Sequence, residues 1–190
     1  GLPFRVIDED GSPYGGKEFA FWNPTMIDLA RGSRRSTNSE SALVFGELMR
    51  RRVRALNFVR SRRMAEVLYV YVRDQLKTTD PTVAAKVAPY RASYLPEDRR
   101  RIERDLFEGR LLGLTTTNAM ELGIDVGDLD ATVLTGYPGS IASTWQQAGR
   151  SGRRGELSLS VLLALDNPLD QYLMRHPEAF FGKSHESARI

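Results

Sequence analysis

The chain has 190 residues and a formal net charge of +3, with 41% hydrophobic and 27% charged residues. This apolar fraction is typical of a folded domain and excludes a disordered tail. With no cysteine and only two histidines, the sequence excludes a disulfide framework and a cysteine-ligated zinc site within these residues. Because no apolar run could span a membrane and the first residues lack a signal-peptide layout, we expect a cytoplasmic protein without a membrane partner.

The basic residues are concentrated in one part of the chain. Residues 31–63 contain ten arginines and two acids, Glu40 and Glu47, which gives a local net charge of +8. Such a concentration favours a polyanion such as nucleic acid as a partner. The alternative is that the arginines cover a solvated helix face.

Residues 1–36 are predicted to form an N-terminal extension. Glycine, proline and aspartate favour irregular chain over residues 1–18. A short apolar strand is expected over 19–22, and a flexible loop over 25–37. This strand could pack on the sheet edge of the same domain or against another domain, and the sequence leaves both open.

Residues 11–18 nearly match a phosphate-binding loop. The pattern requires a hydroxyl residue after Lys17, but Glu18 stands there and would repel phosphate. Strand-like sequence follows, so no helix N-terminus would point at the phosphates. We therefore predict a flexible surface turn at this place.

From residue 37 onward, short apolar strands alternate with helices. Strands are predicted over 55–59, 87–91, 111–116, 131–135 and 157–165. A first helix is predicted to begin at Thr37, Asn38 or Ser39, with Glu40 three residues after Thr37 as a capping box. Further helices are predicted from Ser61 to residue 76 and over 96–109, 119–122, 141–149 and 168–174. The alternation predicts an α/β fold with a mainly parallel central sheet flanked by helices, in a domain over 37–175. Ligands of such sheets bind beyond the carboxyl ends of the strands.

Two segments at such ends carry polar chemistry. In residues 146–154, QQAGRSGRR, two Gly-Arg pairs three residues apart could leave two uncovered guanidinium groups converging on one phosphate. In residues 115–125, TTTNAMELGID, hydroxyls and an amide could donate to phosphate oxygens. Gly123 would let the chain reverse, and Asp125 could accept from sugar hydroxyls. The alternatives are an exposed basic turn and a threonine-rich strand end with a capped turn.

Together these segments resemble conserved motifs of superfamily 2 helicases: residues 115–125 resemble motif V and residues 146–153 motif VI, and residues 57–62, NFVRSR, resemble motif IV. The resemblance covers about residues 37–165 and implies a three-layer RecA-like fold, the second such domain of a helicase. A closer resemblance includes residues 21–24, FWNP, and 136–145, GYPGSIASTW. It is to the mitomycin-repair type of bacterial DNA helicase, an ATP-dependent DExH-box family that moves 3′→5′ on DNA.

The resemblance implies roles for particular residues. Arg150 and Arg153 match the arginine fingers that neutralise the γ-phosphate in the transition state. Nucleotide contacts would come from Gly123, Asp125, Gln146 and Gly149. Nucleic-acid contacts would come from Ser61, Arg62, Arg91, Thr117 and Asn118, although many relatives have a histidine at the position of Arg91. No residue is expected to bind a metal.

The resemblance also implies partners and cofactors. ATP and Mg²⁺ would be bound mostly by a first RecA-like domain of the same chain, and zinc only by a cysteine-bearing region that follows residues 176–190. The polymer partner would be single-stranded or tailed DNA, in DNA repair. The isolated fragment is expected not to hydrolyse ATP. Two alternatives remain open, a nucleic-acid-binding module without an ATP cycle and an RNA helicase domain.

Overall fold

The computed structural model describes residues 16–28, 30, 32–121, 126–152 and 156–182. In chain order the elements are β1 (Lys17–Trp22), β2 (Met26–Asp28), β3 (Ser33–Arg34), α1 (Thr37–Arg50), β4 (Ala55–Phe58), α2 (Arg62–Thr79), α3 (Pro81–Ala84), β5 (Val87–Tyr90), α4 (Pro96–Phe107), β6 (Gly113–Thr116), the 3₁₀ turn η1 (Asn118–Met120), β7 (Ala131–Thr135), α5 (Ile141–Ala148), β8 (Ser158–Leu163), α6 (Pro168–Arg175) and α7 (Glu178–Phe181).

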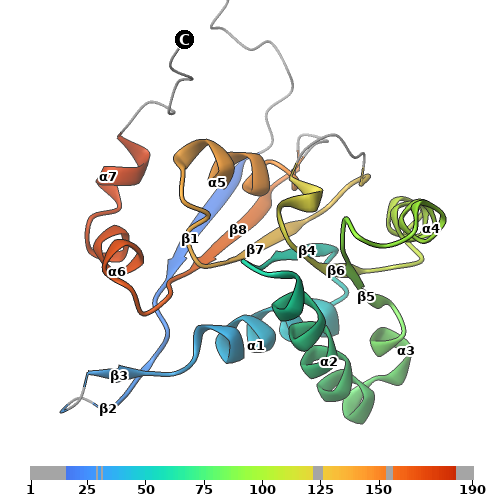
Figure 1. Cartoon of the computed structure of the whole chain (residues 1–190), viewed down its shortest axis with the longest axis horizontal. Coiled ribbons are helices and arrows are strands. Elements are labelled where there is room, and N and C mark those ends of the chain that lie inside the picture. Colours follow the sequence, from blue (N-terminus) through green and yellow to red (C-terminus); the bar gives the residue numbers. More distant parts are fainter. Residues whose placement is uncertain (1–15, 29, 31, 122–125, 153–155, 183–190) are drawn as a thin grey trace, which may run out of the picture.

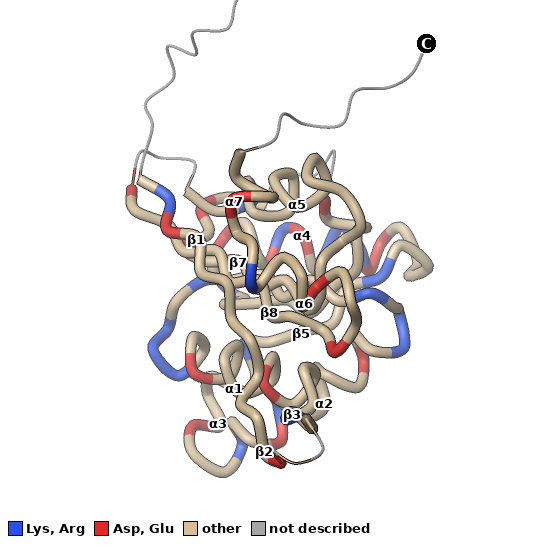
Figure 2. Tube along the Cα trace, turned by 90° about the vertical axis from the view of Figure 1, so that its left-hand side faces the viewer, with Lys and Arg blue, Asp and Glu red and all other residues tan. Residues whose placement is uncertain are grey.

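Six strands form one sheet in the order β1-β8-β7-β4-β6-β5, and every neighbouring pair is parallel. Helices α1, α2 and α3 lie on one side of the sheet, whereas α5 and α7 lie on the other, as two perpendicular views show (Figures 1 and 2). The predicted α/β fold with a parallel central sheet flanked by helices is therefore confirmed.

The core is divided between the two faces of the sheet because successive strand side chains point to opposite sides. Val133 packs in the apolar cluster that includes residues of α1 and α2. The next residue, Leu134, packs in the cluster with Ile141 of α5 and Phe180 of α7. All residues of β4, β6 and β7 are buried, as expected for parallel strands covered on both faces.

Three buried polar side chains tie α1 to the centre of the sheet. The amide nitrogen of Asn57 in β4 donates to the Ser41 hydroxyl at 2.8 Å, and its carbonyl oxygen accepts from Thr135 of β7 at 3.0 Å. The hydroxyls of Ser41 and Thr135 lie 2.7 Å apart and share a third hydrogen bond. The closed triangle satisfies polar groups that would each be costly to bury alone, and it fixes α1 over β4 and β7.

The N-terminal segment belongs partly to the sheet. Strand β1 pairs in parallel with β8 over its whole length, from Lys17 opposite Ser158 to Trp22 opposite Leu163. It therefore forms the sheet edge of this same domain, which was one of the two predicted placements. The flexible loop predicted over 25–37 is wrong, because β2 and β3 form an antiparallel hairpin that projects from a corner of the molecule (Figure 1).

The predicted capping box at the start of α1 is also wrong. Ser36 occupies the N-cap position, and its side chain caps nothing. The Thr37 hydroxyl instead donates to the carbonyl oxygen of Ala164 at 2.7 Å, and Glu40 forms an ion pair with Arg35 at 3.3 Å. Tertiary partners have taken both side chains away from the local motif.

The other expected elements are present with shifted ends. Ser61 caps α2 as predicted and accepts from the Met64 amide at 3.1 Å, but the helix continues to Thr79. Pro96 opens α4 as predicted. The four-residue helices α3 and α7 were not predicted, because one helical turn is too short to show a hydrophobic period.

Gly113 of β6 lies in close contact with side chains of α1. A Cβ at this position would lie 2.7 Å from Sδ of Met49 and 2.8 Å from Cζ of Phe45, both buried. We expect Gly113→Ala to lower the free energy of unfolding by about 1–3 kcal/mol in chemical denaturation. Gly46→Ala is the matched control, because the new methyl meets only ordinary contact at 3.6 Å inside helix α1. It should raise stability by about 0.5–1 kcal/mol, and equal effects of the two substitutions would contradict this packing.

Candidate functional site at the carboxyl edge of the sheet

A polar cavity of about 280 Å³ lies at the carboxyl ends of β4, β6 and β7. Its lining residues come from the last residues of β4 and β7, from the segments that follow β4, β6 and β7, and from α5: Phe58, Val59, Arg60, Thr117, Asn118, Thr135, Gly136, Pro138, Ser143 and Gln147. A smaller cavity of about 160 Å³ is also lined by Arg60, together with Ser61 and Asn38.

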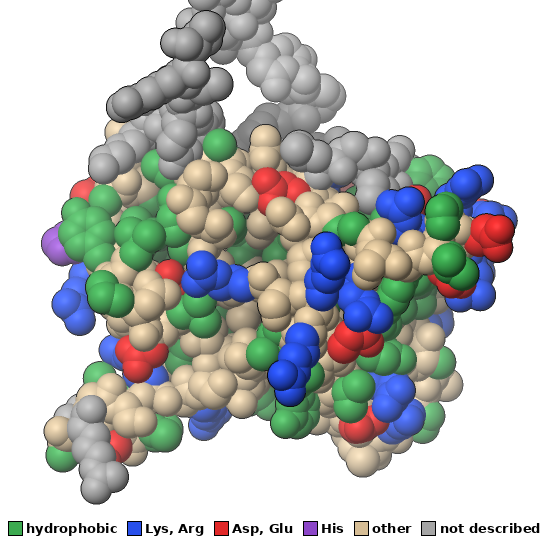
Figure 3. All heavy atoms as spheres, viewed as in Figure 1, with side chains coloured by type: hydrophobic (Ala, Val, Ile, Leu, Met, Phe, Trp, Pro, Cys, Tyr) green, Lys and Arg blue, Asp and Glu red, His purple; other side chains and the backbone are tan. Residues whose placement is uncertain are grey.

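In Figure 3 basic side chains spread over the middle of one face of the molecule. The arrangement places cationic and hydrogen-bonding groups where a phosphate chain could lie.

The structure brings together several residues predicted to contact nucleic acid. Thr117 and Asn118 line the larger cavity, and Ser61 lines the smaller one. Arg62 is exposed at the first turn of α2, next to Ser61. Arg60 lines both cavities but was missed as a site residue, although it stands within the motif IV segment that carried the other two predictions.

A buried glutamate joins the two polar segments. The Oε2 atom of Glu121 accepts from the Ser143 hydroxyl at 2.8 Å and from Nε2 of Gln147 at 2.9 Å, both on α5. The backbone oxygen of Glu121 accepts from the Arg150 guanidinium. Glu121 thus connects the loop after β6, which carries Thr117, with the arginine at the end of α5. Sequence reasoning missed this role because it depends on a partner 22 to 29 residues away.

We call residues 149–152, which follow α5, the arginine turn. It packs closely: a Cβ on Gly149 would lie 2.9 Å from the Trp145 carbonyl oxygen, and a Cβ on Gly152 would lie 2.4 Å from Oγ of Ser158. Gly152 also has φ +85°, which a side chain would strain. Gly152 therefore requires glycine, whereas a side chain at Gly149 would force the end of α5 to shift. The expectation that the glycines leave the guanidinium uncovered is wrong for Arg150, whose side chain is folded back onto Glu121 and is only 8% exposed.

The predicted nucleotide contacts are only partly described. Gln146 and Gly149 are exposed at the end of α5, on the same turn as Arg150. The neighbouring Gln147, which was not singled out, is buried against Glu121. Arg153, Gly123 and Asp125 lie outside the described residues.

Lys17 belongs to the segment that nearly matches a phosphate-binding loop, but the structure places it in a strand instead. It begins strand β1, so no helix follows it. Its ammonium nitrogen Nζ lies 2.8 Å from the carbonyl oxygen of Ala148 and 3.0 Å from that of Ser151. The hydroxyls of Ser151 and Ser158 lie at 2.9 and 3.0 Å. Burial lowers the pKa of Lys17 to about 8, so the side chain is mostly protonated at pH 7. The surface turn predicted here is wrong at Lys17, which is anchored to the end of α5.

Arg91 is bound within the domain. Its Nε atom forms an ion pair with Oε1 of Glu66 at 3.0 Å, and its guanidinium lies over the Tyr94 ring at 4.8 Å. The Tyr94 hydroxyl donates to the same Glu66 oxygen at 2.5 Å. Burial and the neighbouring Glu66 raise the pKa of Tyr94 to about 12. These contacts hold Arg91 against α2, outside both cavities.

Asp170 of α6 holds the loop after β7. One carboxylate oxygen accepts from the backbone amides of Tyr137 at 3.0 Å and Leu165 at 2.8 Å, and the other accepts from the Asn167 side chain at 2.9 Å. Asp170 is only 3% exposed. The carboxylate therefore fixes Gly136 and Pro138, which line the larger cavity, against the C-terminal helices.

We expect Asp170→Ala to lower the free energy of unfolding by about 2–3 kcal/mol, because it removes the carboxylate that accepts from the buried amide of Tyr137 and the partly buried amide of Leu165. Asp166→Ala is the control, since Asp166 lies four residues earlier and is exposed. Urea denaturation followed by circular dichroism measures both. Equal midpoints for the two variants would contradict the role of Asp170.

Within the described residues, no cluster of three or more His, Asp or Glu side chains could hold a metal ion. Among the same described residues, no helix is long and apolar enough to cross a membrane.

The chain is similar to known helicases in sequence. Residues 40–155 match the family model described as "Helicase conserved C-terminal domain". The whole chain is 45% identical to "Uncharacterized ATP-dependent helicase YprA" of Bacillus subtilis and covers 25% of that protein. Over 92% of the chain it is 41% identical to "ATP-dependent helicase HRQ1" of Saccharomyces cerevisiae, of which it covers 16%. The chain thus spans about a quarter or less of these relatives.

Solved structures agree with the sequence comparison. The structure described as "DUF1998 helicase MrfA bound to DNA" matches 99% of the chain with a TM-score of 0.93 and 45% identity, and the chain covers 25% of it. The C-terminal domain of the DEAD-box protein Dbp5 matches with a TM-score of 0.62 at 20% identity, which shows the shared fold. The family model, the relatives and the fold agree, and the chain belongs to the helicase C-terminal domain family, as the second RecA-like domain of a superfamily 2 helicase.

Proposed function

We propose that this chain is the second motor domain of an ATP-dependent DNA helicase, acting over residues 37–175 together with strand β1. In this role the carboxyl edge of the sheet binds the DNA backbone, and Arg150 and Arg153 act as arginine fingers toward ATP that is bound chiefly by a first RecA-like domain. The relatives named as ATP-dependent helicases and the neighbour bound to DNA support this assignment. Polarity from 3′ to 5′, a role in DNA repair and a cytoplasmic location rest on the resemblance alone.

The observation that carries the proposal is the junction at Glu121. Its backbone oxygen binds Arg150, and its carboxylate binds Ser143 and Gln147, two residues that line the larger cavity. A backbone phosphate that displaced the Thr117 loop would therefore also move the acceptor that holds Arg150. This contact gives DNA binding and the arginine turn a common buried element, which a DNA clamp without an ATP cycle would not need.

The groups at the edge suit phosphate binding. Arg60 supplies positive charge, and Thr117 and Asn118 supply hydrogen-bond donors. Contacts of these groups to backbone phosphates would carry no information about the base sequence. ATP with Mg²⁺ supplies the cleavable phosphoanhydride bond. To act on the γ-phosphate when the two motor domains close, the Arg150 guanidinium would have to leave the carbonyl oxygen of Glu121, to which it is bound in this structure.

The test is DNA-stimulated ATP hydrolysis by the full-length protein that carries this chain. We expect Arg150→Ala and Arg150→Lys to lower kcat by about 10³-fold or more, since an arginine finger contributes about that much, while the Kd for ATP changes only a few-fold. Lysine should not rescue turnover, because it lacks the planar fork of donors.

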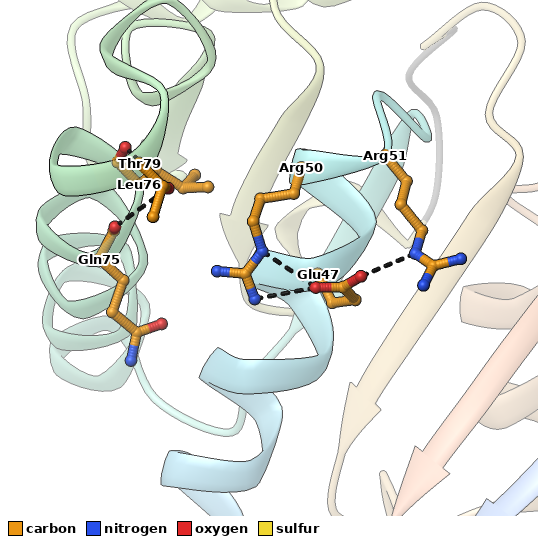
Figure 4. Close-up of polar contacts among 6 residues, drawn as sticks. All are labelled: Glu47, Arg50, Arg51, Gln75, Leu76 and Thr79. Carbon is orange, nitrogen blue, oxygen red and sulfur yellow. Dashed lines mark hydrogen bonds and ion pairs between the residues drawn. The ribbon is translucent and has the colours of Figure 1, made fainter.

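Arg51→Ala is the control for this experiment. Arg51 lies at the far end of α1, near the amino end of β4, and its Nε pairs with Glu47 at 2.7 Å beside Arg50 (Figure 4). It should leave turnover unchanged. Undiminished turnover in the Arg150 variants would overturn the arginine-finger role and favour the nucleic-acid-binding module.

A second prediction concerns the DNA grip. We expect Arg60→Ala and Arg62→Ala each to weaken binding of single-stranded DNA by the full-length protein for every sequence tested. Each should also reduce the steepness of the dependence of log K on log salt by about 1, as expected for the loss of one phosphate contact. Fluorescence anisotropy at several salt concentrations measures this, with Arg51→Ala as the control. A salt dependence identical to that of the wild type would place the DNA elsewhere.

A further inference from the structure

Lys17 connects the edge strand of the sheet to the arginine turn. The two lie more than 130 residues apart in the sequence, yet the ammonium reaches the Ala148 and Ser151 carbonyl oxygens on either side of Gly149 and Arg150. Ser151 and Ala148 are both buried, so these oxygens have little access to water. Carbonyl groups at a helix end need an outside partner, and a cation there is favoured by the helix dipole.

The remaining contacts of Lys17 complete a compact cluster. The ammonium also reaches the hydroxyls of Ser151 and Ser158, so three N–H donors meet four oxygens. Ser158 begins β8 and is the residue against which Gly152 is tightly packed. Lys17 thus binds the residue before the arginine turn and Ser151 within it, while Ser158 of β8 lies against Gly152 at its end.

Arg150 is consequently restrained from two directions. Lys17 binds the backbone on both sides of it, and the Glu121 carbonyl oxygen accepts from its guanidinium. The Glu121 contact would have to break for Arg150 to reach a phosphate. The Lys17 contacts involve only backbone and serine oxygens, so they could persist while the side chain swings out.

We propose that Lys17 is a positioning residue for ATP hydrolysis, which holds the backbone of the arginine turn in place while the side chain of Arg150 moves. This inference rests on the proposed function, since it requires that Arg150 acts on ATP. Neither the sequence motif nor the family model, which matches residues 40–155, includes Lys17. The lysine contacts Ala148, Ser151 and Ser158, and would act on the reaction only through the position of the arginine turn.

The test compares Lys17→Met with wild type in the full-length protein, under DNA-stimulated steady-state conditions. The stem of the side chain is kept and the ammonium removed, so the turn loses its anchor without a cavity. We expect kcat to fall by about 10- to 100-fold, the range for a small misplacement of a reacting group. KM for ATP and Kd for DNA should change less than about threefold, because neither binding surface is altered.

Controls separate this role from a general loss of stability. Lys77→Met removes a lysine that is exposed on α2, 3.8 Å from Asp74, and should leave kcat unchanged. Thermal unfolding confirms that each variant is folded at the assay temperature, and Lys17→Gln replaces Lys17→Met if the latter does not fold. The same fall in kcat with unchanged KM is expected for Lys17→Gln, whose shorter, uncharged amide cannot reach all four oxygens.

Three results can be distinguished. A kcat that falls in the Lys17 and Arg150 variants, with KM retained for Lys17, supports the inference. If a folded Lys17 variant has the kcat of the wild type, the inference is overturned. If kcat of Arg150→Ala nevertheless falls by orders of magnitude in the same assay, the proposed function still stands. A parallel loss of kcat, ATP affinity and DNA affinity in the Lys17 variant also overturns it, because Lys17 would then serve the fold as a whole.

Discussion

The candidate site of this domain depends on the parallel direction of all six strands in its central sheet. Parallel strands place all their carboxyl ends on one side, so the loops after β4, β6 and β7 meet there although they are far apart in sequence. The loops bring Arg60, Thr117 and Gly136 to the wall of one cavity. An antiparallel arrangement of the same strands would divide these residues between two edges.

Buried polar contacts then hold these loops in place. Glu121 binds α5, Asp170 binds the amide of Tyr137, and Lys17 binds the carbonyl oxygens around the arginine turn. Each contact joins elements that are far apart in the sequence. Each also satisfies a polar group that would be costly to bury alone. Such contacts bury little apolar surface, yet they determine where the loop backbones lie. These buried polar contacts therefore fix the geometry of the site and, as at Asp170, also contribute to the stability of the fold.

How well the sequence predicted each element depended on the range of the interactions that form it. Strand β7 and the cap of α2 at Ser61 are local features, and both were predicted correctly. The capping box at Thr37 failed, because its hydroxyl binds Ala164 across the domain. The sequence predicts a flexible loop in place of the hairpin β2–β3, because a two-residue strand is too short to show apolar alternation.

The sequence by itself determined the fold class, the family and the two polar segments, because strand–helix alternation and the spacing of glycine, arginine and threonine are written along the chain. Only the tertiary structure decided what these residues contact. In the fold, Arg150 binds the backbone of Glu121, and Arg91 forms an ion pair with Glu66. Lys17, which stands in a false phosphate-loop pattern, binds the backbone of the arginine turn. The physical reason is that a side chain's charge and donors are local properties, whereas its partner depends on which distant segments the sheet brings within about 3 Å, a normal hydrogen-bonding distance.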